Sequence, residues 1–142
     1  MLKDRLGRII EIKEKIMDDK EKGIEEEKNK LNSINRAIRT VDADIDANYK
    51  RMTAASMKGN DFSVVTGYVE HLNNVKSSLI EESESLQQKI ALLKEELIDL
   101  MKEIKMLGTL KDKISAALKK SLNRREQKLL DDIALRVDER KM

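Results

Sequence analysis

The sequence predicts an all-α protein folded as a long two-helix antiparallel coiled-coil hairpin. Two features of composition favour helix: 39% of the 142 residues are charged, and the chain contains no proline. Cysteine is also absent, which excludes a disulfide scaffold. Proline is the strongest internal helix breaker, so its absence allows long uninterrupted helices. The third feature is spacing, because apolar residues recur at steps of three and four, which is typical of a coiled-coil seam.

The first helix is predicted over residues 2–57. From Leu31 onward its apolar residues follow one another at steps of three or four. The seam is poorer over residues 17–30, where Lys20 and Glu27 would occupy seam positions if the register continued. Such a stretch depends on charge pairs within the helix, each worth about 0.2–0.5 kcal/mol. We therefore expect it to be helical but weakly held.

The second helix is predicted over residues 63–140. Apolar residues recur at steps of four and three without a fault over residues 86–107. Earlier in the helix, Glu82 stands where the preceding register requires an apolar residue. We interpret the passage over residues 79–90 as a stutter in the heptad pattern.

A short break, predicted as a turn over residues 58–62, separates the two helices. Gly59 suits the left-handed position that follows a helix C-terminus. Asp61 or Ser63 suits the N-cap of the next helix. Because the break is short, we expect the helices to fold back on each other within a single coiled-coil domain, residues 1–142. Leu2 would then pair near residue 120, and roughly the last 20 residues would extend beyond the partner helix.

The pattern excludes the common classes of enzyme. A two-helix rod encloses no cavity for a small substrate, and the sequence contains no nucleophile elbow and no phosphate-binding glycine loop. The single histidine, His71, is expected on the helix surface. Asp42, Asp44 and Asp46 have calcium-loop spacing but lack the required glycine and distal glutamate, so we expect a solvated face. We predict a non-enzymatic protein with no cofactor and no metal.

Charge is distributed unevenly along the chain. The net charge of +2 is too small to indicate nucleic-acid binding, and no apolar run approaches the roughly 20 residues of a membrane span, so we expect a cytoplasmic protein. Residues 61–110 carry 5 basic and 9 acidic side chains, whereas residues 111–142 carry 10 basic and 6 acidic ones. The basic group is either a solvated tail or an end steered toward an acidic partner. Its members are Lys119, Lys120, Arg124, Arg125 and Lys128.

The three aromatic residues, Tyr49, Phe62 and Tyr68, all fall near the predicted turn. The start of the second helix also contains more apolar residues than one seam needs. These side chains either pack the end of the hairpin or form a docking surface, because large rigid side chains dominate interfaces.

Two local motifs resemble the FliJ family, the small coiled-coil protein of the flagellar type III export apparatus. One is the start of the second helix, YVEHL at residues 68–72, which is similar to an aromatic-x-x-x-Leu segment of the family. The other is RREQKLLDDIALR at residues 124–136, which is similar to the closing pattern of Gln-Lys, a central Asp and Ala-x-Arg. The resemblance extends over essentially the whole chain.

This resemblance implies a fold similar to the central stalk of rotary ATPases. The end with both termini would bind the hexameric export ATPase (FliI type), and the start of the second helix would bind the cytoplasmic domain of the export gate (FlhA type). Family members also escort export chaperones and lie at the cytoplasmic face of the inner membrane, attached only peripherally. The gate-binding positions would be Tyr68, Leu72, Val75 and Leu79, and the ATPase-binding group is best matched by Arg124, Arg125 and Lys128.

The implied function is that of a non-enzymatic stalk and chaperone escort that links the ATPase to the gate and promotes flagellar protein export. Three alternatives stay open: the equivalent stalk of a virulence type III secretion system, a generic coiled-coil tether or scaffold, and a basic helix that binds RNA or anionic membrane. The four gate-binding positions have the spacing of a docking stripe and equally that of a seam. The sequence therefore leaves open which of them are buried.

Overall fold

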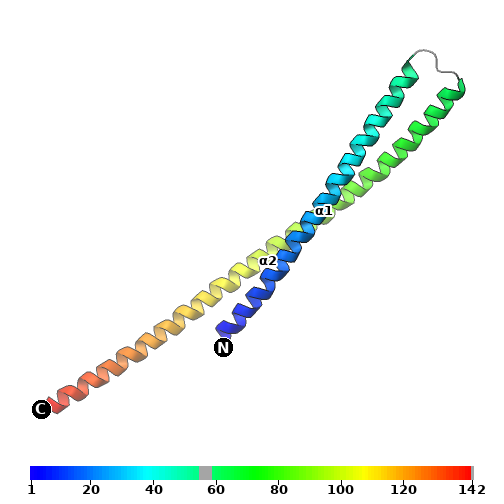
Figure 1. The fold of residues 1–142 in the computed structure, drawn as a ribbon. Helices are drawn as coiled ribbons and strands as arrows, with labels where there is room; N and C mark the ends of the chain where they lie inside the picture. The colour runs from blue at the N-terminus through cyan, green and yellow to red at the C-terminus, as the bar shows by residue number, and fades with distance from the viewer. Residues whose placement is uncertain (55–58, 142) are drawn as a thin grey trace. The chain divides into compact units, whose positions relative to one another are not determined.

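The computed structural model describes residues 1–54 and 59–141. Two helices, α1 over Leu2–Thr53 and α2 over Gly59–Lys141, account for nearly all of these residues, and no strand occurs among them. Both helices are drawn in Figure 1. The prediction of an all-α fold with two long helices is confirmed.

The helix boundaries differ from the predicted ones at the break. Residues 59–62, predicted as part of the turn, form the start of α2, and Gly59 does not adopt the left-handed conformation. Asp61 lies in the first turn of α2, where its negative charge stabilises the positive end of the helix dipole. Residues 55–57, the predicted end of the first helix, and Lys58 of the predicted turn lie outside the described residues.

The chain divides into two compact units, each containing a part of both helices. Unit 1 consists of Met1–Asp18 and Ile98–Met142, and unit 2 consists of Asp19–Leu97. That residues 1–142 form one coiled-coil domain stays a prediction, and the units are described separately below.

Burial along α1 follows an unbroken heptad pattern. Buried or half-buried side chains recur at steps of four and three from Leu6 to Met52. One of the two rows is apolar throughout, whereas the other includes Lys13, Lys20 and Glu27. The prediction that Lys20 and Glu27 occupy seam positions is confirmed. The apolar row consists of Ile10, Met17, Ile24, Leu31, Ile38, Ile45 and Met52.

Burial along α2 also follows an unbroken heptad pattern, so the prediction of a stutter over residues 79–90 is wrong. Ser83, not Glu82, takes the seam position, and it is buried. With Ser83 included, buried or half-buried side chains recur at steps of four and three from Val65 to Ile114. A count of apolar residues alone cannot detect a polar residue that continues the seam.

In unit 2 the two helices run antiparallel. Each step of about seven residues backward along α1 is matched by a similar step forward along α2, as expected for heptads in opposite directions. The atoms in contact are Asp42 Oδ1 with Lys76 Nζ at 2.6 Å, Asn35 Oδ1 with Ser83 Oγ at 3.4 Å, Glu27 Oε1 with Lys89 Nζ at 3.0 Å, and Lys20 Nζ with Glu96 Oε2 at 2.9 Å.

The main apolar cluster of unit 2 joins the C-terminal part of α1 to the start of α2. Ile45 of α1 packs with Val65, Val69 and Leu72 of α2, and all four are buried. Val41 and Met52 pack against this cluster and are partly exposed. Within the described residues no large side chain is fully buried, which is expected because two helices can shield their seam from only part of the solvent.

Unit 1 is also antiparallel, but its register differs from the predicted one. Lys13 Nζ lies 2.6 Å from Glu103 Oε2, and Lys111 Nζ lies 3.4 Å from the position that a Cβ of Gly7 would occupy. This register places Leu2 opposite about residue 115, not residue 120. More of α2 is therefore uncovered, and every side chain over residues 116–140 is exposed.

Candidate docking surfaces

The structure separates the four residues predicted to bind the export gate. Leu72 is only 7% exposed and belongs to the apolar cluster of unit 2. Val75 and Leu79 are half-buried, whereas Tyr68 is 45% exposed. The four side chains therefore do not form one exposed stripe. The physical reason is that Leu72 follows Val65 by one heptad and occupies the same seam row.

Tyr68 is held in place by an acidic residue of the opposite helix. Its hydroxyl donates a hydrogen bond to Asp44 Oδ2 at 2.9 Å. Asn48, buried in the seam, donates from Nδ2 to Asp44 Oδ1 at 3.3 Å and to the Asp44 backbone carbonyl at 2.7 Å. The carboxylate accepts from the phenol and disfavours its ionisation, so Asp44 raises the pKa of Tyr68. The phenol is thus anchored while much of its ring faces solvent.

Other large side chains near the start of α2 are exposed as well. Val64 precedes Tyr68 by one helical turn, so the two are neighbours on the same face of α2. Phe62 of α2 and Tyr49 of α1 are about half-exposed. The excess of apolar residues is visible in the sequence, but the anchor formed by Asp44 and Asn48 is not. The sequence predicts Asp44 on a solvated face, and it assigns no role to Asn48.

The charged seam residues of unit 2 centre on Glu27, which is buried. Its Oε1 accepts hydrogen bonds from Lys89 at 3.0 Å and from Lys30 at 3.4 Å. Within the described part of the chain, its Oε2 is buried without a partner. The hydrogen bond from Lys89 is the main cause of a lowered pKa for Glu27, and Lys30 adds to it against the cost of desolvation. Only Glu27 is buried in these pairs, whereas the Lys89 and Lys30 side chains are more than half exposed, so the pairs offset the desolvation of Glu27 and add little further stability.

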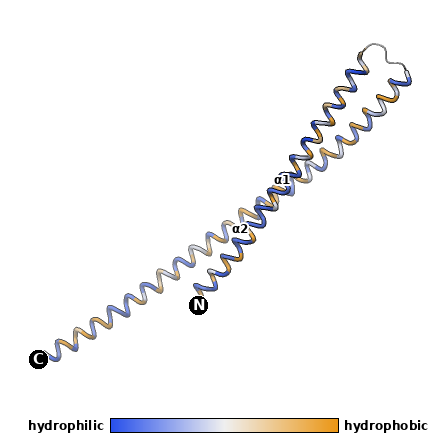
Figure 2. Tube along the Cα trace, in the orientation of Figure 1, coloured by the Kyte–Doolittle hydropathy of each residue, from blue (hydrophilic) through white to orange (hydrophobic). Residues whose placement is uncertain are grey.

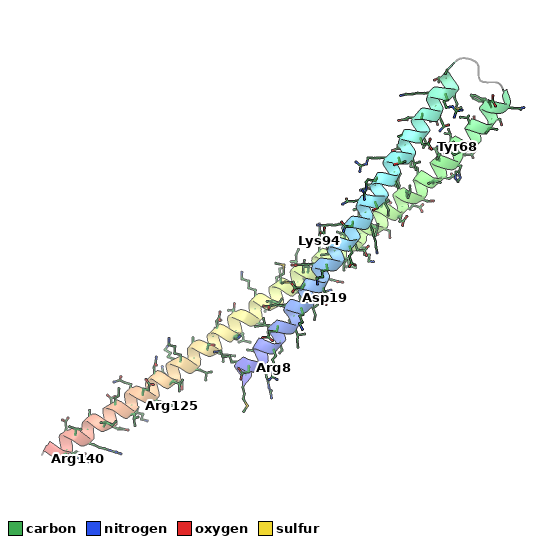
Figure 3. The ribbon with its side chains drawn as sticks, viewed as in Figure 1. Arg8, Asp19, Tyr68, Lys94, Arg125 and Arg140 are labelled. Carbon is green, nitrogen blue, oxygen red and sulfur yellow. The ribbon has the colours of Figure 1, made fainter. Side chains whose placement is uncertain are left out.

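The predicted ATPase-binding group lies on the uncovered part of α2. Arg124, Arg125 and Lys128 are all exposed, and none takes part in a salt bridge among the described residues. Figure 3 labels Arg125 on this segment, which lies beyond the part of α2 that pairs with Arg8 and its neighbours in unit 1. These cations are therefore free to meet an acidic surface.

The same segment also exposes apolar side chains. Figure 2 shows hydrophobic positions interspersed with hydrophilic ones along α2 to its C-terminal end. An unpartnered helix with a recurring apolar stripe is typical of a docking element. The exposed apolar residues are Leu118, Leu122, Leu129, Leu130, Ile133, Leu135 and Val137.

Two further observations concern membranes and metals. In the described ranges, neither α1 nor α2 has a segment with the length and hydropathy needed to cross a bilayer. The same ranges contain no group of three or more potential metal ligands. Asp42 and Asp44, two members of the calcium-like spacing, instead bind Lys76 and Tyr68.

Comparison with known protein families gives a match over nearly the whole chain. The family described as "Flagellar FliJ protein" matches residues 2–142. Neither the curated proteins nor the solved structures that were searched gave a match. Because the family match covers essentially the whole chain, and the two-helix fold agrees with it, the chain belongs to the flagellar FliJ family and is a component of the flagellar export apparatus.

Proposed function

We propose that this protein is a non-enzymatic stalk that links the hexameric export ATPase to the export gate and promotes flagellar protein export. Its family membership supports a role in the export apparatus. The observation that carries the more specific role is the uncovered part of α2, residues 116–140, where all side chains are exposed and basic residues cluster.

The geometry of this segment suits insertion into a ring. A single helix is about 10–12 Å wide with its side chains, and 25 helical residues extend about 38 Å. Its cations can be attracted by acidic side chains that line a pore, because electrostatic complementarity speeds association and fixes orientation. In this proposal Arg124, Arg125 and Lys128 contact the ATPase and bias which of its subunit interfaces close.

The second docking surface in this proposal is at the start of α2. Tyr68 supplies an anchored, half-exposed aromatic ring, which is a common type of interface anchor. Val64 and the half-buried Val75 extend the apolar surface on either side of it. Leu72 contributes indirectly, by holding the helix that presents Tyr68. Leu79 is half-buried in the same seam row as Leu72 and supports this surface in the same indirect way.

Placement in the cell follows from these partners. The protein acts in the cytoplasm, at the inner-membrane export apparatus, and reaches the membrane only through the gate. It also escorts export chaperones to that site. Neither nucleic acid nor a cofactor is required for this role.

ATP hydrolysis by the cognate ATPase tests the stalk role. We expect saturating amounts of this protein to promote ring assembly and to raise the hydrolysis rate. The variant Arg124→Glu/Arg125→Glu/Lys128→Glu should lose this effect, whereas Tyr68→Ala should retain it. Unchanged assembly and unchanged hydrolysis at saturating protein would refute the stalk role.

A tether that self-associates through its C-terminal segment is the second candidate. The exposed leucines at positions 118, 122 and 129 favour it, because unpartnered apolar stripes pair with one another. Sedimentation of the isolated protein distinguishes the two functions. A stalk should remain a monomer, whereas a tether should form a dimer that Leu122→Ser/Leu129→Ser dissociates.

A further inference from the structure

Unit 1 carries a second apolar surface, on the part where α1 covers α2. Two hollows adjoin Met106, a residue that is 71% exposed. One, of about 340 Å³, lies between Lys13 of α1 and Glu103, Met106 and Leu107 of α2. The other, of about 510 Å³, extends along α2 past Leu110. Hollows on both sides of an exposed side chain can accept the side chains of a further helix.

Exposed isoleucines of α1 border the same side of the pair. Ile9, Ile16 and Asp44 each lie one position before a residue of the α1 seam. Asp44 follows Ile16 by four heptads, so the three residues share one heptad position. In α2, Tyr68 and Leu110 likewise each lie one position before a seam residue, and they are six heptads apart. They therefore share one heptad position. The hydrogen bond between Tyr68 and Asp44 shows that these two heptad positions face each other across the helices. Ile9 and Ile16 therefore lie on the same side as Leu110.

We call the two hollows and the exposed apolar residues beside them the unit 1 groove. Met106 and Leu110 of α2 line the hollows, Ile9 and Ile16 of α1 lie on the same side, and Ile12 directly precedes Lys13, which lines the smaller hollow. All five apolar residues are more than 40% exposed. Exposed apolar groups that gather in this way on a soluble protein mark an interaction site. The hollows extend over residues 102–113, which correspond to about 17 Å of helix and thus to about three turns of a bound helix.

The charges around the groove identify the kind of partner. Lys102, Lys105 and Lys113 line the larger hollow, and no acidic residue does. The one acidic residue of the smaller hollow, Glu103, is already paired with Lys13. The part of unit 1 around the groove, residues 1–18 and 98–115, has 9 basic and 7 acidic residues, a net charge of +2. Carboxylates that flank the apolar stripe of a partner would meet these free lysines.

We propose that the unit 1 groove binds an amphipathic helix of another protein whose apolar stripe is flanked by glutamate or aspartate. Within the described residues, a second copy of this chain supplies no such helix. Its uncovered segment, residues 116–140, exposes an apolar stripe but carries 7 basic and 5 acidic side chains, so the charge beside that stripe is mainly positive. Its acidic run at Glu81, Glu82 and Glu84 belongs to unit 2, where the neighbouring Leu79 and Leu86 are held in the seam. The groove is separate from residues 116–140, so its role does not depend on the proposed contact with the ATPase.

The test uses the full chain and a designed 21-residue peptide with leucine at the two seam positions of each heptad and glutamate at the flanking positions. Repulsion among its own carboxylates keeps this peptide from pairing with itself. Fluorescence anisotropy should show binding that weakens as salt is added. A peptide with lysine in place of glutamate should bind at least tenfold more weakly.

Variants locate the binding site. Ile12→Ser/Met106→Ser should weaken binding of the glutamate peptide at least tenfold. The matched control is Leu122→Ser/Leu129→Ser on the uncovered segment, whose side chains are similarly exposed, and it should leave binding unchanged. Circular dichroism verifies that both variants remain helical, because all four residues lie outside the buried seam.

Three results would overturn the proposal. Equal affinity for the glutamate and lysine peptides would remove the charge argument. Loss of binding in the control variant but not in the groove variant would move the site to residues 116–140. Dimerisation of the isolated chain that Ile12→Ser/Met106→Ser abolishes would show that a second copy occupies the groove.

Discussion

Substitution of Leu72 and of Tyr68 should have different consequences, although the two residues lie one helical turn apart. Leu72 is 7% exposed and packs with Ile45, Val65 and Val69. Truncation of a buried leucine to alanine costs about 2–5 kcal/mol. We expect about 2–3 kcal/mol for Leu72→Ala, because the neighbours in a two-helix seam can relax into the space. With a urea m-value of about 2 kcal/mol/M, the unfolding midpoint should fall by about 1–1.5 M.

Tyr68→Ala removes one hydrogen bond and a half-exposed ring, so its effect on stability should be clearly smaller. Urea unfolding followed by circular dichroism measures both variants, with Val64→Ala as an exposed control. Binding to the purified gate domain, at a temperature where all variants are folded, should be weakened most by Tyr68→Ala. A Tyr68→Ala variant as unstable as Leu72→Ala would refute the assignment of Leu72 to the core and Tyr68 to the surface.

Two further predictions concern ionisable groups. Lysine neighbours lower the pKa of Glu27, so its charge stabilises the fold above its ordinary pKa of 4.5, and this contribution is lost as the pH falls through the lowered value. Glu27→Leu removes a buried charge whose Oε2 has no hydrogen-bond partner among the described residues. We therefore expect a higher midpoint of urea unfolding at pH 7, and a midpoint that changes less as the pH is lowered. A lower midpoint at pH 7 would show that the Glu27 charge stabilises the seam more than leucine does. Asp44 raises the pKa of Tyr68, so in a Tyr49→Phe background the phenolate absorbance should appear above the ordinary pKa of 10.0. Asp44→Asn should lower that titration midpoint, and no change would show that the hydrogen bond is absent in solution.

The heptad pattern was predictable from the sequence because apolar residues dominate it. One row of each helix is apolar throughout, so these rows indicate two paired helices. The short break between them indicates that the helices are antiparallel. Polar seam members were harder to place. Lys20 and Glu27 can be assigned by extending the register, whereas Ser83 cannot be recognised from the spacing of apolar residues.

The docking surfaces were predicted less completely, for reasons of geometry. A stripe with steps of four, three and four is equally a seam and a surface, so the sequence could not show that Leu72 is buried while Tyr68 is exposed. The hydrogen bond between the Tyr68 hydroxyl and the Asp44 carboxylate joins residues that are 24 positions apart in the sequence. It forms only in the register that the two helices adopt, so the sequence alone did not indicate it. The extent of the uncovered segment also depends on the register of the two helices. The predicted turn placed Leu2 opposite residue 120, whereas the structure places it opposite about residue 115.

Binding of this protein to both partners in parallel tests the proposed linking role most directly. The purified export ATPase and the purified gate domain are each titrated with the unchanged protein, with Arg124→Glu/Arg125→Glu/Lys128→Glu and with Tyr68→Ala. We expect the charge-reversed variant to lose the ATPase and keep the gate, and Tyr68→Ala to weaken gate binding and keep the ATPase. If both folded variants retain both partners, or if either one loses both, the assignment of separate docking surfaces to the two partners is wrong.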